Sequence, residues 1–128
     1  MYINSSAEVK SLSDIICTSS NAIDIVRSIP ADKKIIFAPD KHLGDYVRRK
    51  TGRDMILWDG ACIVHQAFSN EKLDKLFIKY PNAKLIAHPE SHKDLLNRAV
   101  FVGSTTALIN YVKESEHQTL LIGTEVGV

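Results

Sequence analysis

The chain has 128 residues, of which 45% are hydrophobic and 24% charged, and its formal net charge at pH 7 is +1. This composition is ordinary for a globular protein, and basic side chains cluster only in the short run 48–50, so we expect no nucleic-acid partner. No apolar stretch approaches the roughly 20 residues that a membrane span requires, and the first residues lack the pattern of a signal peptide. We therefore expect no membrane partner and a cytoplasmic location.

Five short apolar runs along the chain predict strands. They are residues 35–38, 55–58, 85–87, 100–102 and 120–122. Because each run is continuous rather than alternating, it is typical of a strand that is covered on both faces. Apolar side chains at helical spacing lie between the runs, as in the stripe formed by Leu73, Leu76, Phe77 and Tyr80. The alternation of strands and helices predicts an α/β fold, a three-layer αβα domain with a mostly parallel sheet.

Two serines predict where helices begin. Ser5 with Glu8, and Ser91 with Asp94, have the spacing of capping boxes, in which a hydroxyl and a carboxylate satisfy free amides at a helix start. We find no linker, charge block or internal repeat that would divide the chain. The sequence therefore predicts a single domain over residues 1–128.

Cys62 and His65 follow an apolar run and lie about one helical turn apart. A thiol and an imidazole can ligate a metal or form a reactive centre, but such a pair is also found as ordinary packed or solvated side chains. Adding His88 and His92 gives the residue count of a zinc site, although the long gap suits a structural zinc finger badly. A reducing cytosol disfavours a disulfide between Cys17 and Cys62.

Polar groups also follow the next two predicted strands. His88 and Glu90 straddle Pro89, so an extended strand end would point both side chains the same way, as a proton donor and its orienting carboxylate. The alternative is a surface loop in which Glu90 helps to cap a helix. Ser104 and Thr105 offer hydroxyls and amides to an anion at a helix start, or form an ordinary N-cap. In an open α/β sheet, ligands bind at the carboxyl ends of parallel strands, so we expect the function at this edge.

Six motifs taken together resemble those of the quinolinate synthase family. In chain order they are residues 2–10, 13–14 with 17–22, 39–44, 60–65, 88–90 and 103–105. Each motif alone would be weak, but all occur in the family's order with compatible spacing. The resemblance implies a protein of three similar αβα domains around a pseudo-threefold axis, with a central 4Fe-4S cluster held by one cysteine from each domain. This chain resembles only the middle domain, so we expect that the flanking domains are absent from it.

The resemblance also assigns roles to individual residues. It implies that Cys62 is one of three cluster ligands, that the other two lie outside this chain, and that Cys17 is not a ligand. The expected catalytic residues are Tyr2, His65, His88 and Glu90. The expected substrate-binding residues are Tyr2, Asn4, Ser19, His88, Glu90, Ser104 and Thr105.

The reaction implied by the resemblance condenses iminoaspartate with dihydroxyacetone phosphate, and dehydrations and ring closure then give quinolinate, the pyridine precursor of NAD. L-aspartate oxidase is the implied protein partner, as the supplier of iminoaspartate. Since only one fitting cysteine is present, we expect the isolated fragment to be inactive. Two rival interpretations stay open: a non-enzymatic α/β module that binds a phosphorylated metabolite through Ser104 and Thr105, and a structural zinc domain.

Overall fold

The computed structural model describes residues 1–126, and the chain divides into two compact units between Ala61 and Cys62. Each unit combines helices with parallel strands. The predicted α/β class is therefore confirmed. That the two units form a single domain stays a prediction. Within residues 1–126, no helix is both long enough and apolar enough to cross a membrane.

The first unit is built on short parallel strands. Its elements are α1 (Ala7–Ser11), α2 (Ala22–Ser28), β1 (Ile36–Phe37), α3 (Lys41–Thr51) and β2 (Ile56–Leu57). β1 pairs with β2 in parallel. On the other side of β1, the Tyr2 amide donates to the Ala38 carbonyl at 2.7 Å, and Tyr2 forms a parallel bridge with Cys17. Tyr2 and its neighbours therefore act as a central strand between Cys17 and β1.

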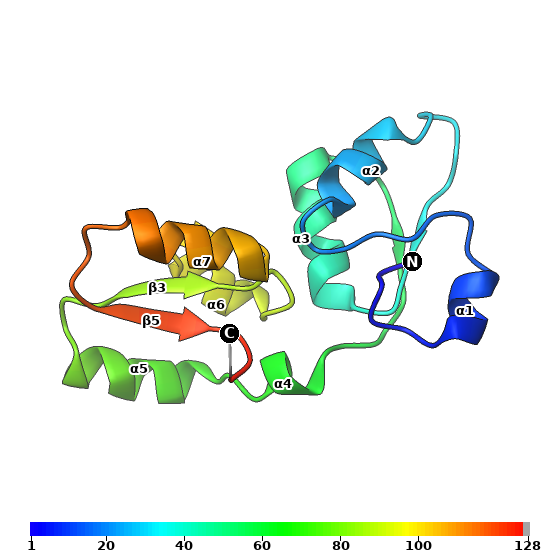
Figure 1. Cartoon of the computed structure of the whole chain (residues 1–128). Coiled ribbons are helices and arrows are strands. Elements are labelled where there is room, and N and C mark those ends of the chain that lie inside the picture. Colours follow the sequence, from blue (N-terminus) through cyan, green and yellow to red (C-terminus); the bar gives the residue numbers. More distant parts are fainter. Residues whose placement is uncertain (127–128) are drawn as a thin grey trace. The chain divides into compact units, whose positions relative to one another are not determined.

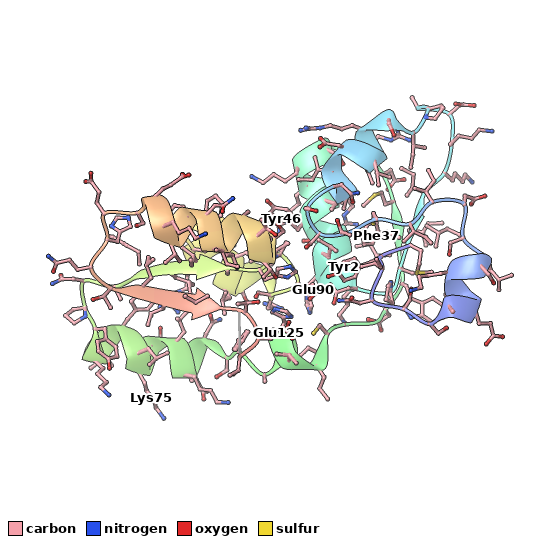
Figure 2. The ribbon with its side chains drawn as sticks, in the orientation of Figure 1. Tyr2, Phe37, Tyr46, Lys75, Glu90 and Glu125 are labelled. Carbon is pink, nitrogen blue, oxygen red and sulfur yellow. The ribbon has the colours of Figure 1, made fainter. Side chains whose placement is uncertain are left out.

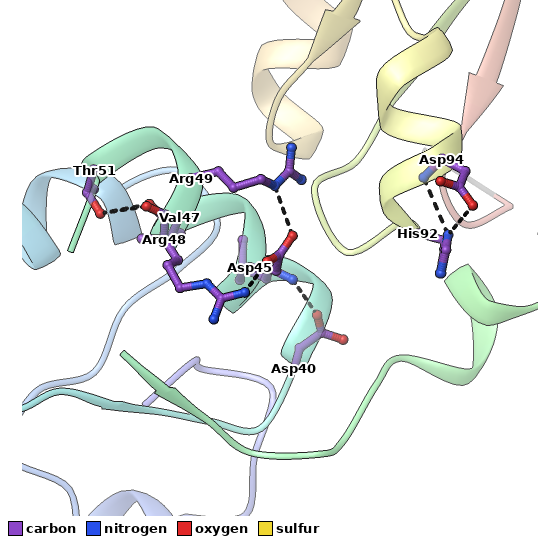
Figure 3. A network of polar contacts seen from close by, with 9 residues as sticks. Asp40, Asp45, Val47, Arg48, Arg49, Thr51, His92 and Asp94 are labelled. Carbon is purple, nitrogen blue, oxygen red and sulfur yellow. Dashed lines mark hydrogen bonds and ion pairs between the residues drawn. The ribbon is translucent and has the colours of Figure 1, made fainter. Parts of the chain in front are cut away.

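Apolar side chains of these strands and of α2 and α3 form the core of the first unit. The buried members are Tyr2, Cys17, Ala22, Val26, Ile35, Phe37, Leu43, Val47 and Met55. Tyr2 and Phe37 are labelled in Figure 2. α3 begins after Asp40, whose carboxylate accepts the Leu43 amide at 2.7 Å, and it ends at Gly52, whose φ of 69° is the left-handed conformation that favours glycine. Figure 3 shows the Asp40 cap.

The second unit has the layers predicted from the sequence. Its elements are α4 (Ile63–Gln66), α5 (Asn70–Lys79), β3 (Lys84–Ala87), α6 (Lys93–Arg98), β4 (Phe101–Val102), α7 (Thr105–Glu114) and β5 (Leu120–Gly123). The strands form a parallel sheet in the order β4-β3-β5. Figure 1 shows α5 on one face of this sheet and α6 and α7 on the other. β3 is central and mostly buried, which explains its continuous apolar sequence.

The two predicted capping boxes are wrong by one residue. Ser6, not Ser5, caps α1, and the Ser5 hydroxyl instead donates to the Tyr2 carbonyl at 3.0 Å. Likewise His92, not Ser91, caps α6, while the fully buried Ser91 lies within 3.5 Å of the Gly123 carbonyl. In both cases the serine hydroxyl lies against a backbone carbonyl, which is three residues away for Ser5 and 32 residues away for Ser91.

The two units repeat one strand arrangement, although their sequences show no repeat. The Tyr2 amide donates to the Ala38 carbonyl, and the His88 amide donates to the Gly123 carbonyl. On the opposite side, the Cys17 amide donates to the Met1 carbonyl, as the Gly103 amide does to the Ala87 carbonyl. These bonds align the tripeptide 2–4 with the tripeptide 88–90, and Ser19 with Thr105. The repeat is thus visible in the backbone hydrogen bonds and not in the sequence.

Candidate functional site

The carboxyl end of β3 carries the densest group of buried polar side chains in the second unit. His88, Glu90 and Ser91 follow this strand directly, and each is at most 4% exposed. The parallel register places Gly103 and Gly123 on either side of this segment, so the residues that follow β4 and β5 belong to the same edge. The structure thus brings Ser104 to the edge that carries His88, as the sequence predicts.

Glu90 lies between two imidazoles. Its Oε2 is 3.1 Å from Nδ1 of His65 and 3.5 Å from Nδ1 of His88. The two imidazole rings stack with centroids 5.1 Å apart and an angle of 26° between their planes. Figure 2 labels Glu90 within the second unit. The sequence predicted the pair His88 and Glu90, and the structure adds His65 as the nearer partner of the carboxylate.

Two groups of Glu90 lie close to Nδ1 of His88. The Glu90 amide is 3.4 Å from this nitrogen and the carboxylate Oε2 is 3.5 Å from it. Burial lowers the pKa of His88, and the nearby His65 adds to this, although the Glu90 carboxylate opposes it. Glu90 therefore contacts His88 through both its backbone amide and its carboxylate.

The surroundings of His65 shift its pKa in the opposite direction from that of His88. Burial acts to lower its pKa, but hydrogen bonding and charge interactions with Glu90 and Cys62 outweigh burial and raise the pKa. Two neighbouring imidazoles thus have pKa values that are shifted in opposite directions. Such a divergence is what a site for general acid and base catalysis requires.

Cys62 brings a thiol to this group. It occupies the N-cap position of α4 and is partly buried, and His65 lies in the single turn that follows. One ligand atom from each of Cys62, His65 and Glu90 lies within 4.8 Å of the others. Within the described part of the chain, both ring nitrogens of His65 are buried and neither makes a well-aligned hydrogen bond. The three residues therefore fit a metal centre.

An iron-sulfur cluster is held mainly by thiolates, and this group supplies one of them. The other cysteine, Cys17, is buried in the core of the first unit, and burial raises the pKa of its thiol. Cys17 is thus poorly suited to act as a thiolate ligand. His92, which completes the zinc count in the sequence, caps α6, and its Nδ1 lies 3.4 Å from the Asp94 carboxylate. The structure places Cys62 and His65 together but assigns His92 to a different role.

Ser104 and Thr105 begin α7 at the end of β4. The Ser104 hydroxyl accepts the Ala107 amide at 3.4 Å, so the N-cap interpretation is correct for this residue. Both residues are only partly buried. Thr124 follows β5 at the same edge and is 8% exposed, and sequence reasoning missed it. The sequence signal for Thr124 was its position just after a predicted strand.

Three of the expected site residues lie in the first unit. Tyr2 is buried, and the Asn4 side-chain amide donates to its hydroxyl at 3.2 Å. Ser19 lies two residues after Cys17, just past the parallel bridge between Cys17 and Tyr2. Through the repeated hydrogen bonds, Tyr2 and Asn4 occupy the positions that His88 and Glu90 occupy in the second unit. Tyr2, Asn4 and Ser19 therefore belong to the first unit, and the other expected site residues belong to the second. That all of them form one site stays a prediction.

Parallel strands with helices packed on them define the α/β class of proteins. Within this class the chain belongs to the quinolinate synthase family, because the family model described as "Quinolinate synthetase A protein" matches residues 1–128. It is 57% identical over 127 residues to the quinolinate synthase of Synechocystis sp., 56% to that of Cyanothece sp. and 55% to that of Trichodesmium erythraeum. Each match covers 99% of this chain but only 39–40% of the relative. The chain thus spans about two-fifths of the length of these relatives.

Proposed function

We propose that this chain is part of a quinolinate synthase, in which it supplies proton-transfer groups, anion-binding groups and one cluster ligand. The longer enzyme would condense iminoaspartate with dihydroxyacetone phosphate to form quinolinate for NAD biosynthesis in the cytoplasm. The observation that carries the proposal is the buried arrangement of His65, Glu90 and His88 in a chain whose relatives are named quinolinate synthase.

The reaction needs protons to be removed from carbon and given to leaving hydroxyl groups. His88, whose pKa is lowered mainly by burial, suits a group that accepts and passes on a proton at a ring nitrogen. His65, held by the Glu90 carboxylate, suits the role of proton donor. Tyr2 occupies the position equivalent to His88 in the first unit, and its hydroxyl is a further candidate for proton transfer.

Both substrates carry anionic groups. Ser104 and Thr105 at the start of α7 provide hydroxyls and amides for a phosphate or a carboxylate, and Ser19 occupies the equivalent position in the first unit. Asn4 provides an amide that can both donate and accept hydrogen bonds. The proposal assigns substrate binding to these groups together with Tyr2, His88 and Glu90.

Cys62 is the proposed ligand of a 4Fe-4S cluster, whose other thiolates would come from outside this chain. An iron with an open coordination position would supply a Lewis acid for a carboxylate or a leaving hydroxyl. L-aspartate oxidase, which would supply iminoaspartate, is the proposed protein partner. The isolated chain, with one fitting cysteine, is proposed to be inactive.

Steady-state kinetics of the longer, cluster-loaded protein that carries this segment test the proposal. His88→Ala should lower kcat by about 100-fold to 10,000-fold, the usual effect of losing a general acid or base. Ser104→Ala combined with Thr105→Val should mainly raise KM for dihydroxyacetone phosphate, since a hydrogen bond to a charged group contributes about 1.5–3 kcal/mol.

His92→Ala is the matched control, because this exposed histidine should leave both parameters near the wild-type values. If His88→Ala raises KM and leaves kcat unchanged, His88 is a binding residue and not an acid-base group. If the wild-type protein makes no quinolinate from these substrates, the proposed function is wrong.

A further inference from the structure

Cys62, His65 and Glu90 bring three chemically different metal ligands together within the second unit. One ligand atom from each residue lies within 4.8 Å of the others. Cys62 is the N-cap of α4 and His65 lies in its single turn, while Glu90 follows β3. All three residues belong to the unit that begins at Cys62, so the group does not depend on how the two units are arranged.

The ring of His65 is held in place by its neighbours. It stacks on His88 with centroids 5.1 Å apart, and it meets the Phe68 ring nearly edge-on at 5.8 Å. Both ring nitrogens of His65 are buried, and neither makes a well-aligned hydrogen bond within the described residues. Because buried polar atoms are costly without an aligned partner, an ion bound to one of these nitrogens would stabilise the folded chain.

The contact between His65 and Glu90 has nearly the length that separates two ligands of one ion. Nδ1 of His65 lies 3.1 Å from Oε2 of Glu90. Zinc binds nitrogen and oxygen at about 2.0–2.2 Å with tetrahedral angles, which places two such atoms about 3.3–3.5 Å apart. The Cys62 sulfur would have to lie about 3.6 Å from each, which is about 1.2 Å less than the 4.8 Å limit of the group. Cys62 is only partly buried, so its side chain has room for this adjustment.

The three ligand types favour zinc over magnesium and calcium. Magnesium and calcium take oxygen ligands, whereas a thiolate and an imidazole suit zinc. A zinc ion would also place positive charge beside Glu90, which is 4% exposed and whose carboxylate is costly to bury without an opposite charge.

We propose that Cys62, His65 and Glu90 form a site for a single zinc ion, held by the thiolate, one ring nitrogen and one carboxylate oxygen. Water fills the fourth position, as in other zinc sites with three protein ligands. Binding releases the proton of the Cys62 thiol. The site differs from the proposed cluster, because all its ligands come from this chain and only one is a thiolate. Since both need Cys62, zinc and the cluster exclude each other, a consequence that rests on the proposed function.

Calorimetric titration of the metal-free 128-residue chain with Zn²⁺, without oxygen and with a reductant that contains no thiol, tests the site. One zinc ion per chain is expected. Cys62→Ser, His65→Ala and Glu90→Gln should each weaken binding at least about 10-fold, since even losing a group that only orients a ligand costs about 10–100-fold in metal affinity. Cys17→Ala and His92→Ala are the matched controls, because they remove the same side-chain types outside the site, and they should keep the wild-type affinity.

Co²⁺ is the optical probe of the same site, because a thiolate ligand gives cobalt a charge-transfer band that oxygen and nitrogen ligands do not. The wild-type chain should show this band, and Cys62→Ser should lose it. Circular dichroism confirms that each variant is folded, and the isosteric Glu90→Gln keeps the test valid if His65→Ala does not fold. No zinc binding by the folded wild-type chain, unchanged zinc affinity in Cys62→Ser or Glu90→Gln, or a cobalt spectrum without the sulfur band would overturn the proposal.

The competition between zinc and the cluster is tested in the longer protein that carries this segment. Zn²⁺ added before anaerobic reconstitution should lower the iron content of the wild type, and Glu90→Gln, which keeps Cys62, should need at least about 10-fold more zinc for the same loss. Undiminished iron content in protein that has bound zinc at this site would overturn the competition. Protein that takes up no iron even without zinc would contradict the proposed function instead, and the titration of the 128-residue chain would still decide the zinc site.

Discussion

At the scale of residues, the site depends on one carboxylate shared by two imidazoles. The spacing of His88 and Glu90 after an apolar run correctly predicted that both lie at a strand end. The sequence did not predict that the Glu90 carboxylate lies nearer to His65, at 3.1 Å. That distance depends on how α4 folds back toward the end of β3, and no local pattern encodes it.

Removal of the Glu90 charge should lower the pKa of His65. Burial acts to lower this pKa and the carboxylate is one of the groups that outweigh it, so Glu90→Gln leaves burial with less opposition. An NMR titration of the histidine side chains in the 128-residue chain measures the effect. Asp94→Asn, beside the exposed His92, is the control and should not change the pKa of His65. An unchanged pKa of His65 in Glu90→Gln would show that the carboxylate does not control this imidazole.

At the scale of elements, apolar runs predicted the five named strands, although only β3 has the burial that a continuous apolar sequence indicates. The helix caps were less predictable. Ser5 and Ser91 had the correct type and spacing, but their hydroxyls lie against the carbonyls of Tyr2 and Gly123 instead. Whether a serine caps a helix depends on which carbonyl its hydroxyl meets in the folded chain. The carbonyl that Ser91 meets belongs to Gly123, which is distant in sequence.

The helix α3 carries an ion-pair network whose effect on stability depends on pH. Asp45 accepts hydrogen bonds from Arg48 at 2.7 Å and from Arg49 at 2.9 Å (Figure 3). Burial acts to raise the pKa of Asp45, but the two arginines outweigh it and lower the pKa below the ordinary value of 3.8. The stabilisation is therefore fully present above about pH 4 and is lost as the pH falls through the lower pKa of the folded state.

Asp45→Asn should reduce the free energy of unfolding by about 0.5–1 kcal/mol at pH 7, in line with partly exposed ion pairs. The difference from the wild type should shrink as the pH falls below 4. Urea unfolding at a series of pH values measures it. Asp24→Asn provides the comparison, since the carboxylate of Asp24 is 82% exposed and 3.9 Å from Arg27, and it should have almost no effect. A pH-independent difference for Asp45→Asn would contradict the ion-pair explanation.

At the scale of the whole chain, the family and the α/β class were predictable because six motifs and the strand pattern extend over its full length. The internal repeat was not predictable, because Tyr2-Ile3-Asn4 and His88-Pro89-Glu90 share no side chain and are related only through backbone hydrogen bonds. Side-chain patterns cannot reveal a repeat that is conserved only in the backbone.

The 128-residue chain alone should not hold a stable 4Fe-4S cluster. Its thiols are Cys62 and the buried Cys17, and a cluster needs more thiolates than the group around Cys62 provides. Anaerobic reconstitution followed by iron and sulfide analysis should give far less than four of each per chain. A stable stoichiometric cluster on this chain would contradict the proposal that the other ligands lie outside it.

The most direct test of the proposed function is the iron and sulfide content of the longer protein that carries this segment, purified without oxygen, with and without Cys62→Ala. We predict that the wild-type protein contains a 4Fe-4S cluster and that Cys62→Ala loses it, together with quinolinate formation. Cys17→Ala, which removes the thiol of the first-unit core, should retain the cluster. Full iron and sulfide content in Cys62→Ala would contradict the assignment of Cys62 as the ligand that this chain contributes.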